Sequence, residues 1–265
     1  MIYAKQDSDI ILSTLDKGLH VLEILSVTDA PAGLTLTELG RAAGMHRTTL
    51  FRILATLQAR GLVARDDATD RYRLGIGVLT LASALLRDID IRRVARPALR
   101  ALSRRTQELV YLTVLDKAEV VTVERFDSDQ AISLRTDIGS RRPTYCTASG
   151  KAFLAYLPAE DVDRILQLGM PALTPRTITS PEVMRHHLEE VRRRGFAWDD
   201  EERLEGVRCV AAPVFGGDGS VGSTVSIAAP SLRTPWERLR QLGEEVCATA
   251  AEISRQLGFV TRNAG

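Results

Sequence analysis

Cysteine is scarce in this chain of 265 residues, and its three cysteines, Cys146, Cys209 and Cys247, lie far apart. None belongs to a C-x-x-C pair, so the sequence indicates neither a disulfide framework nor a zinc finger. No early segment looks like a signal peptide, and no apolar run approaches the ~18–20 residues that a membrane span needs. These absences favour a cytoplasmic protein with no metal site and no membrane partner.

Excess charge and catalytic signals are also lacking. The formal net charge is +1, so any contact with nucleic acid must come from a local basic patch. The four histidines lie in no evident catalytic setting, and no G-x-S-x-G nucleophile elbow occurs. We therefore expect a chain that is not an enzyme and needs no cofactor. Its length allows two domains.

The segment from Thr35 to Leu74 carries the first clear pattern. Thr35 followed three residues later by Glu38 has the spacing of a capping box, which starts a helix that Gly44 breaks. A second helix is predicted from about Arg47 to Arg60. Its apolar residues recur at helical spacing, at positions 50, 53, 54 and 57. Gly61 ends this helix.

A hairpin follows, with strands at 62–65 and 71–74 around the turn-rich segment 66–70. Helix, glycine turn, helix and hairpin together predict a winged helix-turn-helix. From Leu39 to Val63 there are four arginines and no carboxylate, which suits a helix that reads base edges and phosphates. The alternative is a small packing module with a solvated basic face. The residues expected to bind DNA are Thr35, His46, Arg47, Thr48, Thr49, Arg52, Arg65 and Arg71.

Helices are expected on both sides of this module. One spans 13–27, with Leu15, Leu19, Leu22 and either Leu25 or Ile24 facing inward. Another spans 78–93, and its apolar stripe indicates either internal core or a linker that packs against a second subunit. The arginines between positions 87 and 105 are interpreted as a solvated helix face rather than a DNA contact. A proline at position 97 predicts the start of a new helix that runs to about position 106.

The remainder of the chain mixes strands and helices. Strands are predicted at 109–115, 120–126, 131–136, 207–215 and 221–228, and 139–143 is predicted as a loop. Helices are predicted at 147–157, at 158–168, from Ser180 to Gly195, and from a capping box at Thr234–Glu237 to about Leu257. Antiparallel strand pairs with segregated helices predict an α+β domain with a sensor role.

Three segments resemble the IclR family of bacterial transcriptional regulators. They are TTLFRILATLQARGLV in the winged module, RRPTYCTASGKAFLA at 141–155, and RGFAWDDEERLEGVRCVAAPVFGGDGSVGSTVSIAAP at 194–230. The resemblance implies an α+β chain with a winged helix-turn-helix over 1–76, a linker and dimerisation helix over 77–93, and a GAF-like effector-binding domain over 94–265. It further implies a homodimer or tetramer that binds a double-stranded DNA operator, controls a catabolic operon, and responds to a small-molecule effector such as a carboxylic acid.

A ligand site can be sketched from the residues alone. The run from Thr147 to Lys151 opens a helix, where free backbone N–H groups suit an anion. Hydroxyl residues such as Ser226 interrupt otherwise apolar strands and are candidates for orienting a bound molecule. A small carboxylate held by the helix start and by Ser226 is the resulting hypothesis.

The family resemblance adds further residues to this site. It implies that Ala148, Ser149, Asp199, Cys209 and Ser226 line the pocket. Each has a structural alternative: Cys209 as a small strand residue, Asp199 as a turn cap, Ser226 as a local hydrogen-bond donor.

The chain also departs from the family. It carries Ala228 where relatives often have serine, Tyr145 where many have histidine, and Arg142 where an apolar residue is common. The run of Tyr145, Cys146 and Thr147 is similar to that of members that sense aromatic acids, so Tyr145 is expected to stack on or hydrogen-bond to an aromatic ligand. Arg142 would pair with a carboxylate unless it is a solvent-facing loop residue. A DNA-binding repressor that responds to no ligand remains the alternative function. Sequence does not decide the effector, the operator, the regulated genes, or repression against activation.

Overall fold

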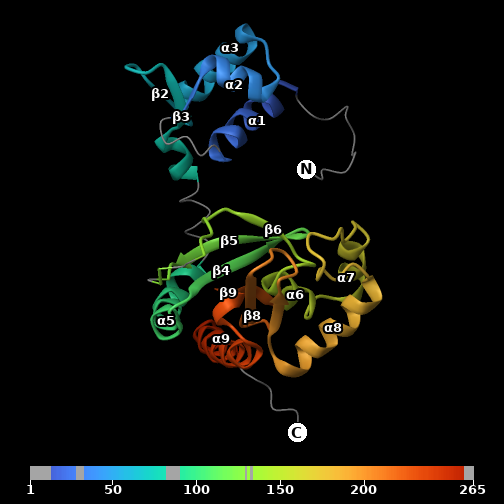
Figure 1. Cartoon of the computed structure of the whole chain (residues 1–265). Coiled ribbons are helices and arrows are strands. Elements are labelled where there is room, and N and C mark those ends of the chain that lie inside the picture. The colour runs from blue at the N-terminus through green and yellow to red at the C-terminus, as the bar shows by residue number, and fades with distance from the viewer. Residues whose placement is uncertain (1–12, 28–32, 82–89, 129, 132–133, 260–265) are drawn as a thin grey trace. The chain divides into compact units, whose positions relative to one another are not determined.

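The computed structural model describes residues 13–27, 33–81, 90–128, 130–131 and 134–259 (Figure 1). The chain divides into two compact units, residues 1–88 and 89–265, each with its own hydrophobic core. Among the described residues, no helix combines the length and the apolar character that crossing a membrane requires.

The N-terminal unit packs three helices: α1 Ser13–Val27, α2 Leu36–Ala43 and α3 Arg47–Ala59. Their core contains Leu39, Leu50 and Leu54, as the helical spacing predicted. The predicted inward face of α1 is confirmed at Leu25 but wrong at Leu15 and Leu19, which are 60% and 52% exposed while Val21 and Leu25 are buried. Both sets have helical spacing, so periodicity alone does not decide which apolar stripe meets α2 and α3.

The wing is the predicted hairpin of β2 Val63–Asp66 and β3 Arg71–Leu74. A third strand, β1 Leu34–Thr35, pairs with β3 on its other edge and is too short to show a pattern in sequence. The capping box is confirmed: Thr35 Oγ1 accepts from the Glu38 N–H at 3.3 Å, and the Thr35 N–H donates to the Glu38 carboxylate at 2.7 Å.

The predicted helix over 78–93 lies partly outside the described residues. Residues 76–81 are helical, and the next described helix is α5 Asp90–Thr106. The predicted helix start at Pro97 is wrong, because α5 runs through this proline. A proline inside a helix removes one backbone hydrogen bond, but Ala95, Ala98 and Leu99 on either side of it are buried in the core, and this packing outweighs the local preference.

The C-terminal unit is built on a six-stranded antiparallel sheet in the order β6-β5-β4-β9-β8-β7. The strands are β4 Leu109–Asp116, β5 Glu119–Phe126, β6 Arg141–Pro143, β7 Ala197–Asp200, β8 Val207–Phe215 and β9 Val221–Pro230. The predicted strand at 131–136 is wrong: its described residues are not in a strand, and 141–143, predicted as loop, takes the edge position beside β5. Since that edge accepts one partner, the alternating pattern at 131–136 has nothing to pair with.

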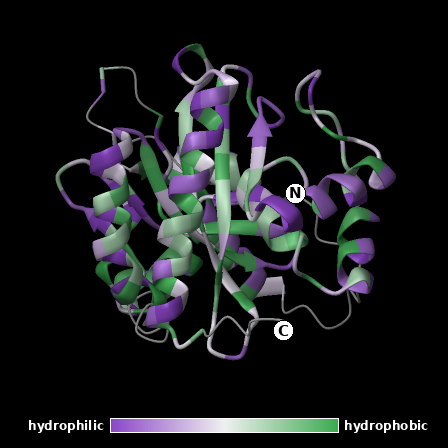
Figure 2. Cartoon of the chain, turned by 90° about the horizontal axis from the view of Figure 1, so that it is seen from below, coloured by the Kyte–Doolittle hydropathy of each residue, from purple (hydrophilic) through white to green (hydrophobic). Residues whose placement is uncertain are grey.

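Helices cover both faces of this sheet (Figure 1). Helices α5 and α9 Trp236–Gln256 pack on one face, and α6 Ala148–Leu154 with α7 Ala159–Leu166 and α8 Pro181–Arg194 lies on the other. The helices carry both hydrophobic and hydrophilic residues along their length, as elements with one buried side do (Figure 2). Alternation along β8 separates the two cores, because Val210 faces α9 while Cys209 and Ala211 face α6.

Most helix starts of this unit follow their sequence signals. Thr147 and Ser180 cap α6 and α8 through their side chains, and Gly195, with φ +83°, ends α8. The capping box predicted at Thr234 is wrong. The N-cap of α9 is Pro235, without a side-chain bond, because the Thr234 hydroxyl donates to the Pro230 carbonyl at 2.9 Å.

Candidate DNA-binding face and ligand cavity

The predicted DNA-reading residues of α3 lie on its solvent side. Leu50, Ile53 and Leu54 bury one face of the helix. The opposite and flanking positions are exposed, and they carry His46, Arg47, Thr48, Thr49 and Arg52. Among the described residues, no carboxylate forms an ion pair with the arginines at 47 and 52, so their charge is available to an anionic partner.

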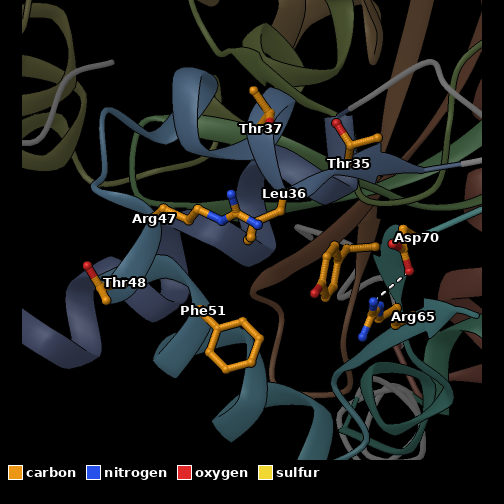
Figure 3. A pocket seen from close by; sticks show the side chains of 9 residues that line it. Thr35, Leu36, Thr37, Arg47, Thr48, Phe51, Arg65 and Asp70 are labelled. Atoms are coloured by element: carbon orange, nitrogen blue, oxygen red, sulfur yellow. Dashed lines mark hydrogen bonds and ion pairs between the residues drawn. The ribbon is translucent and has the colours of Figure 1, made fainter.

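A groove of about 600 Å³ runs between α3, the start of α2 and the wing (Figure 3). Its walls combine hydroxyl groups, two arginines and one exposed phenylalanine. The lining residues are Thr35, Leu36, Thr37, Arg47, Thr48, Phe51, Arg65, Asp70 and Tyr72. The mixture suits a polar and anionic partner with some apolar surface.

Three of the predicted DNA contacts also have partners within the unit. Thr35 caps α2, and Arg71 donates to the Gly33 carbonyl at 2.8 Å and to Glu38 at 3.2 Å. The hydrogen bonds from Thr35, together with Arg71, lower the pKa of Glu38. Arg65 forms an ion pair with Asp70 at 2.5 Å across the wing turn. The structure thus separates the α3 arginines Arg47 and Arg52, which form no ion pair with a described carboxylate, from Arg65 and Arg71 of the wing, which do.

The arginines of α5 are largely matched by groups of their own unit. Arg92 and Arg96 approach the Glu124 carboxylate at 3.3 and 3.5 Å, and Arg105 approaches Glu245 at 3.5 Å. Arg100 lies over the Phe126 ring. These pairings agree with the interpretation that this basic run is a helix face and not a DNA contact.

The C-terminal unit encloses a cavity of about 80 Å³ on the α6 side of its sheet. Side chains from β4, β8 and β9 form its wall, and the loops before β6 and after β7 complete it. The lining residues are Leu109, Tyr111, Leu134, Arg135, Thr136, Arg142, Thr147, Asp199, Arg203, Leu204, Val207, Cys209 and Ala228.

The predicted effector residues fall into two groups. Arg142, Asp199 and Cys209 line the cavity. The others are buried nearby but are not among its lining residues, and two of them bond to each other: the Ser149 and Ser226 hydroxyls lie 2.8 Å apart. Tyr145 donates its hydroxyl to the Pro171 carbonyl at 2.8 Å, and Ala148 begins α6.

Arg142 is a buried cation with only neutral partners. It is 9% exposed and donates to the hydroxyls of Thr122 at 3.2 Å and Ser140 at 3.0 Å. Its guanidinium lies 5.2 Å from the centre of the Tyr111 ring. No carboxylate in the described part of the chain forms an ion pair with it. A buried charge without a counter-ion is unfavourable, and a bound anion would remove that cost.

The pKa of Asp199 is unusually high for a carboxyl group. Burial raises its pKa to about 7, although the nearby Lys151 opposes the shift. Asp199 also accepts a hydrogen bond from the Glu202 N–H at 2.8 Å. Lys151 is fully buried and forms an ion pair with Glu202, whose second carboxylate oxygen, Oε2, is buried without a hydrogen-bond partner. Near neutral pH, Asp199 therefore exists in both protonation states.

Two family models match the chain: the IclR helix-turn-helix domain over residues 14–67 and the bacterial transcriptional regulator IclR C-terminal domain over residues 83–255. The chain belongs to the IclR family of transcriptional regulators. It is 34% identical over 257 residues to the regulator KdgR of Escherichia coli K12, covering 97% of this chain and 98% of KdgR. It is 30% identical to the repressor IclR of the same strain, covering 93% and 90%.

Solved structures agree with this assignment. The IclR of Thermotoga maritima superposes with a TM-score of 0.79 at 30% identity, covering 94% of this chain and all of that one. An IclR homologue of Microbacterium hydrocarbonoxydans, complexed with 4-hydroxybenzoate, gives 0.80 at 26% identity, covering 92% and 98%. The predicted family and α+β fold are confirmed: this IclR-family protein is a DNA-binding transcriptional regulator and not an enzyme.

Several residues that line the cavity of this IclR-family regulator were not predicted from the sequence. Tyr111 reads as an ordinary strand residue, and Arg135, Thr136 and Arg203 read as loop residues. No local signal marks them, because strand pairing and loop packing bring them together. Thr147 was the exception, since it opens the helix-start run that suggested an anion site.

Proposed function

We propose that a small carboxylate binds in the cavity of the C-terminal unit and changes the affinity of this regulator for its operator. The observation that carries the proposal is Arg142, a buried arginine at the cavity wall with no counter-ion among the described residues. An arginine binds a carboxylate through two parallel N–H donors, which gives both energy and orientation. The homologue complexed with 4-hydroxybenzoate supports a carboxylic acid as the ligand class.

The size of the cavity favours an aliphatic acid. At about 80 Å³ the cavity is small. A short keto acid suits so small a space better than an aromatic acid does. Protonated Asp199 would donate a hydrogen bond to a keto or carboxylate oxygen. Cys209 would form part of the apolar wall of the cavity. In this proposal Tyr145, Ala148, Ser149 and Ser226 support the wall from behind.

The DNA-binding part of the proposal assigns the operator to the exposed face of α3. His46, Arg47, Thr48, Thr49 and Arg52 would enter the major groove, where N-terminal residues of recognition helices read base edges. The wing residues Arg65 and Arg71, and Thr35 at the start of α2, would lie beside the phosphate backbone.

The coupling between ligand and operator is proposed to act through a dimer. We propose that residues 1–76 bind DNA, 77–93 link and dimerise, and 94–265 bind the effector, in a homodimer or tetramer on a pseudo-palindromic operator. A ligand alters DNA affinity only by binding the two DNA-binding states unequally. The exposed apolar side chains of residues 76–81, among them Ile76 at 77% and Leu79 at 57%, are consistent with such an interface.

A thermal-shift screen tests the effector assignment. Short keto acids and aromatic acids are compared on the wild type, on Arg142→Met and on Arg141→Met. Arg141 is the matched control because it lies next in the same strand, exposed and paired with Asp116 and Glu119. A ligand at 100 times its dissociation constant adds about 2.7 kcal/mol to stability. We expect a keto acid to act on the wild type and Arg141→Met but not on Arg142→Met.

The screening hit is then titrated into an operator-binding assay. A change in operator affinity supports a ligand-responsive regulator. A shift that persists in Arg142→Met would contradict the role of Arg142, and a response only to aromatic acids would contradict the size argument. The absence of any hit would favour the alternative, a repressor that responds to no ligand.

A further inference from the structure

Phe51 is a large apolar side chain on the DNA side of α3. It is 56% exposed and takes no part in the core of the N-terminal unit. It lines the groove between α3 and the wing together with Arg47 and Thr48 (Figure 3). No aromatic partner contacts it within the described part of the chain. More than half of the Phe51 side chain is thus open to the groove, beside arginines and threonines, and is available to a partner that offers apolar surface.

The surroundings of Phe51 fit the major groove of DNA. At 100° per residue, Thr48, Arg52, Ala55 and Ala59 point directly away from the buried face of the helix, and Phe51 stands beside them. The short side chains at 48, 55 and 59 let the backbone of α3 approach a partner closely. Phe51 then projects from the side of the contact face.

The charge at this face also matches DNA. Arg47 and Arg52 flank Phe51 without carboxylate partners in the described chain, and the only acidic residue lining the groove, Asp70, is neutralised by Arg65. A nucleic acid therefore meets positive charge on both sides of the ring. The apolar feature that DNA offers in its major groove is the 5-methyl group of thymine.

We propose that Phe51 packs against a thymine methyl group and thereby specifies a T·A pair in each half-site of the operator. The proposal rests on the assignment of α3 to the major groove. It adds a contact that distinguishes thymine from cytosine by shape and apolar surface rather than by hydrogen bonds.

The test removes one methyl group at a time. An operator is selected from a random DNA pool with the full-length protein, and each thymine of one half-site is replaced in turn by deoxyuridine. Burial of one methyl group is worth about 0.8 kcal/mol, which corresponds to about a fourfold change in affinity. We expect one replacement to weaken wild-type binding about fourfold and to leave binding by Phe51→Ala unchanged. Phe51→Leu, which keeps an apolar contact, should retain most of the effect.

Other outcomes have separate meanings. If every deoxyuridine replacement affects the wild type and Phe51→Ala equally, the methyl contact is overturned while the DNA-binding face stands. If Phe51→Ala changes the association state of the protein instead, the ring belongs to an interface between copies, and the proposal is again overturned. If Arg52→Ala also binds the operator normally, the assignment of α3 itself is wrong. Unchanged thermal stability of each variant confirms that it has folded.

Discussion

The two units handle charge in opposite ways. On α3, Arg47 and Arg52 are exposed on a helix whose other side supplies the core. In the C-terminal unit, Arg142 on β6, Lys151 on α6 and Asp199 on β7 are buried. An exposed arginine costs the fold little and is free to bind, whereas a buried charge must be matched by protein or ligand. Substituting the α3 arginines should therefore change operator binding with little change in stability, whereas substituting a buried charge of the second unit should change stability.

The largest effect is expected at Lys151. Its replacement by methionine leaves the Glu202 carboxylate buried without its counter-ion, which costs about 3–5 kcal/mol. For a unit of this size the melting temperature should fall by roughly 6–20 °C, as followed by calorimetry. The double variant Lys151→Met/Glu202→Gln should recover much of this loss. A single variant as stable as the wild type would contradict the claim that this unit depends on its buried charges.

Operator affinity should fall about 100-fold or more in Arg52→Ala. One specific contact is worth ~1–3 kcal/mol, and a two-fold symmetric complex loses it in both half-sites. Arg60→Ala, an exposed arginine at the end of α3, is the matched control and should bind normally. The variant should keep its melting temperature and its effector response, as measured by fluorescence anisotropy and thermal shift. Loss of both activities would indicate misfolding instead.

The protonation of Asp199 should make the stability of the C-terminal unit depend on pH. Its pKa, raised to about 7 in the folded state from an ordinary 3.8, means that the folded state binds the proton more tightly than the unfolded state. Its contribution to stability is therefore full below pH 3.8 and is lost as pH rises to about 7, by at most ~1.4 kcal/mol per pH unit. The stability advantage of the wild type over Asp199→Asn should shrink from pH 5 to 7 and then level off.

This experiment needs the variant and not the wild type alone. Burial lowers the pKa of His187 to about 3, and that shift makes stability rise with pH below 6.5, opposite in sign. The difference between wild type and Asp199→Asn cancels the histidine. Denaturant titrations across this pH range measure it. A flat difference would mean that the Lys151 charge, which faces Asp199, keeps the carboxyl group ionised.

The smallest effect is expected at Thr35. Thr35→Ala removes the side-chain cap of α2 and should cost about 1 kcal/mol, or roughly 4–8 °C in the melting of the N-terminal unit. Thr37→Ala, an exposed threonine in the first turn, is the control. If Thr35→Ala weakens operator binding but not stability, the Thr35 hydroxyl contacts DNA rather than stabilising the helix.

Sequence reasoning succeeded where neighbours along the chain decide the structure. The caps at Thr35, Thr147 and Ser180 and the two central hairpins depend on residues a few positions apart. It failed where distant packing decides: α5 continues through Pro97 because its flanking residues are buried, and 141–143, predicted as a loop, pairs with β5 as an edge strand.

The cavity was only partly predictable for the same reason. Asp199 and Cys209 were named through family resemblance, and Arg142 through its departure from the family. Tyr111 and Thr136 reach the cavity only after β4 has paired with β9 and the loop before β6 has packed. No spacing in the sequence indicates that this strand and this loop line the same cavity.

The paired arginines of the wing have a consequence for the salt dependence of operator binding. A cationic side chain that neutralises a DNA phosphate releases condensed counterions and steepens the dependence of affinity on salt by about 0.9 per contact. Because Asp70 already neutralises Arg65 and Glu38 already neutralises Arg71, these two arginines add little to that slope. Operator binding should then depend on salt less steeply than the full number of basic residues on this face would give, and Asp70→Asn should steepen it.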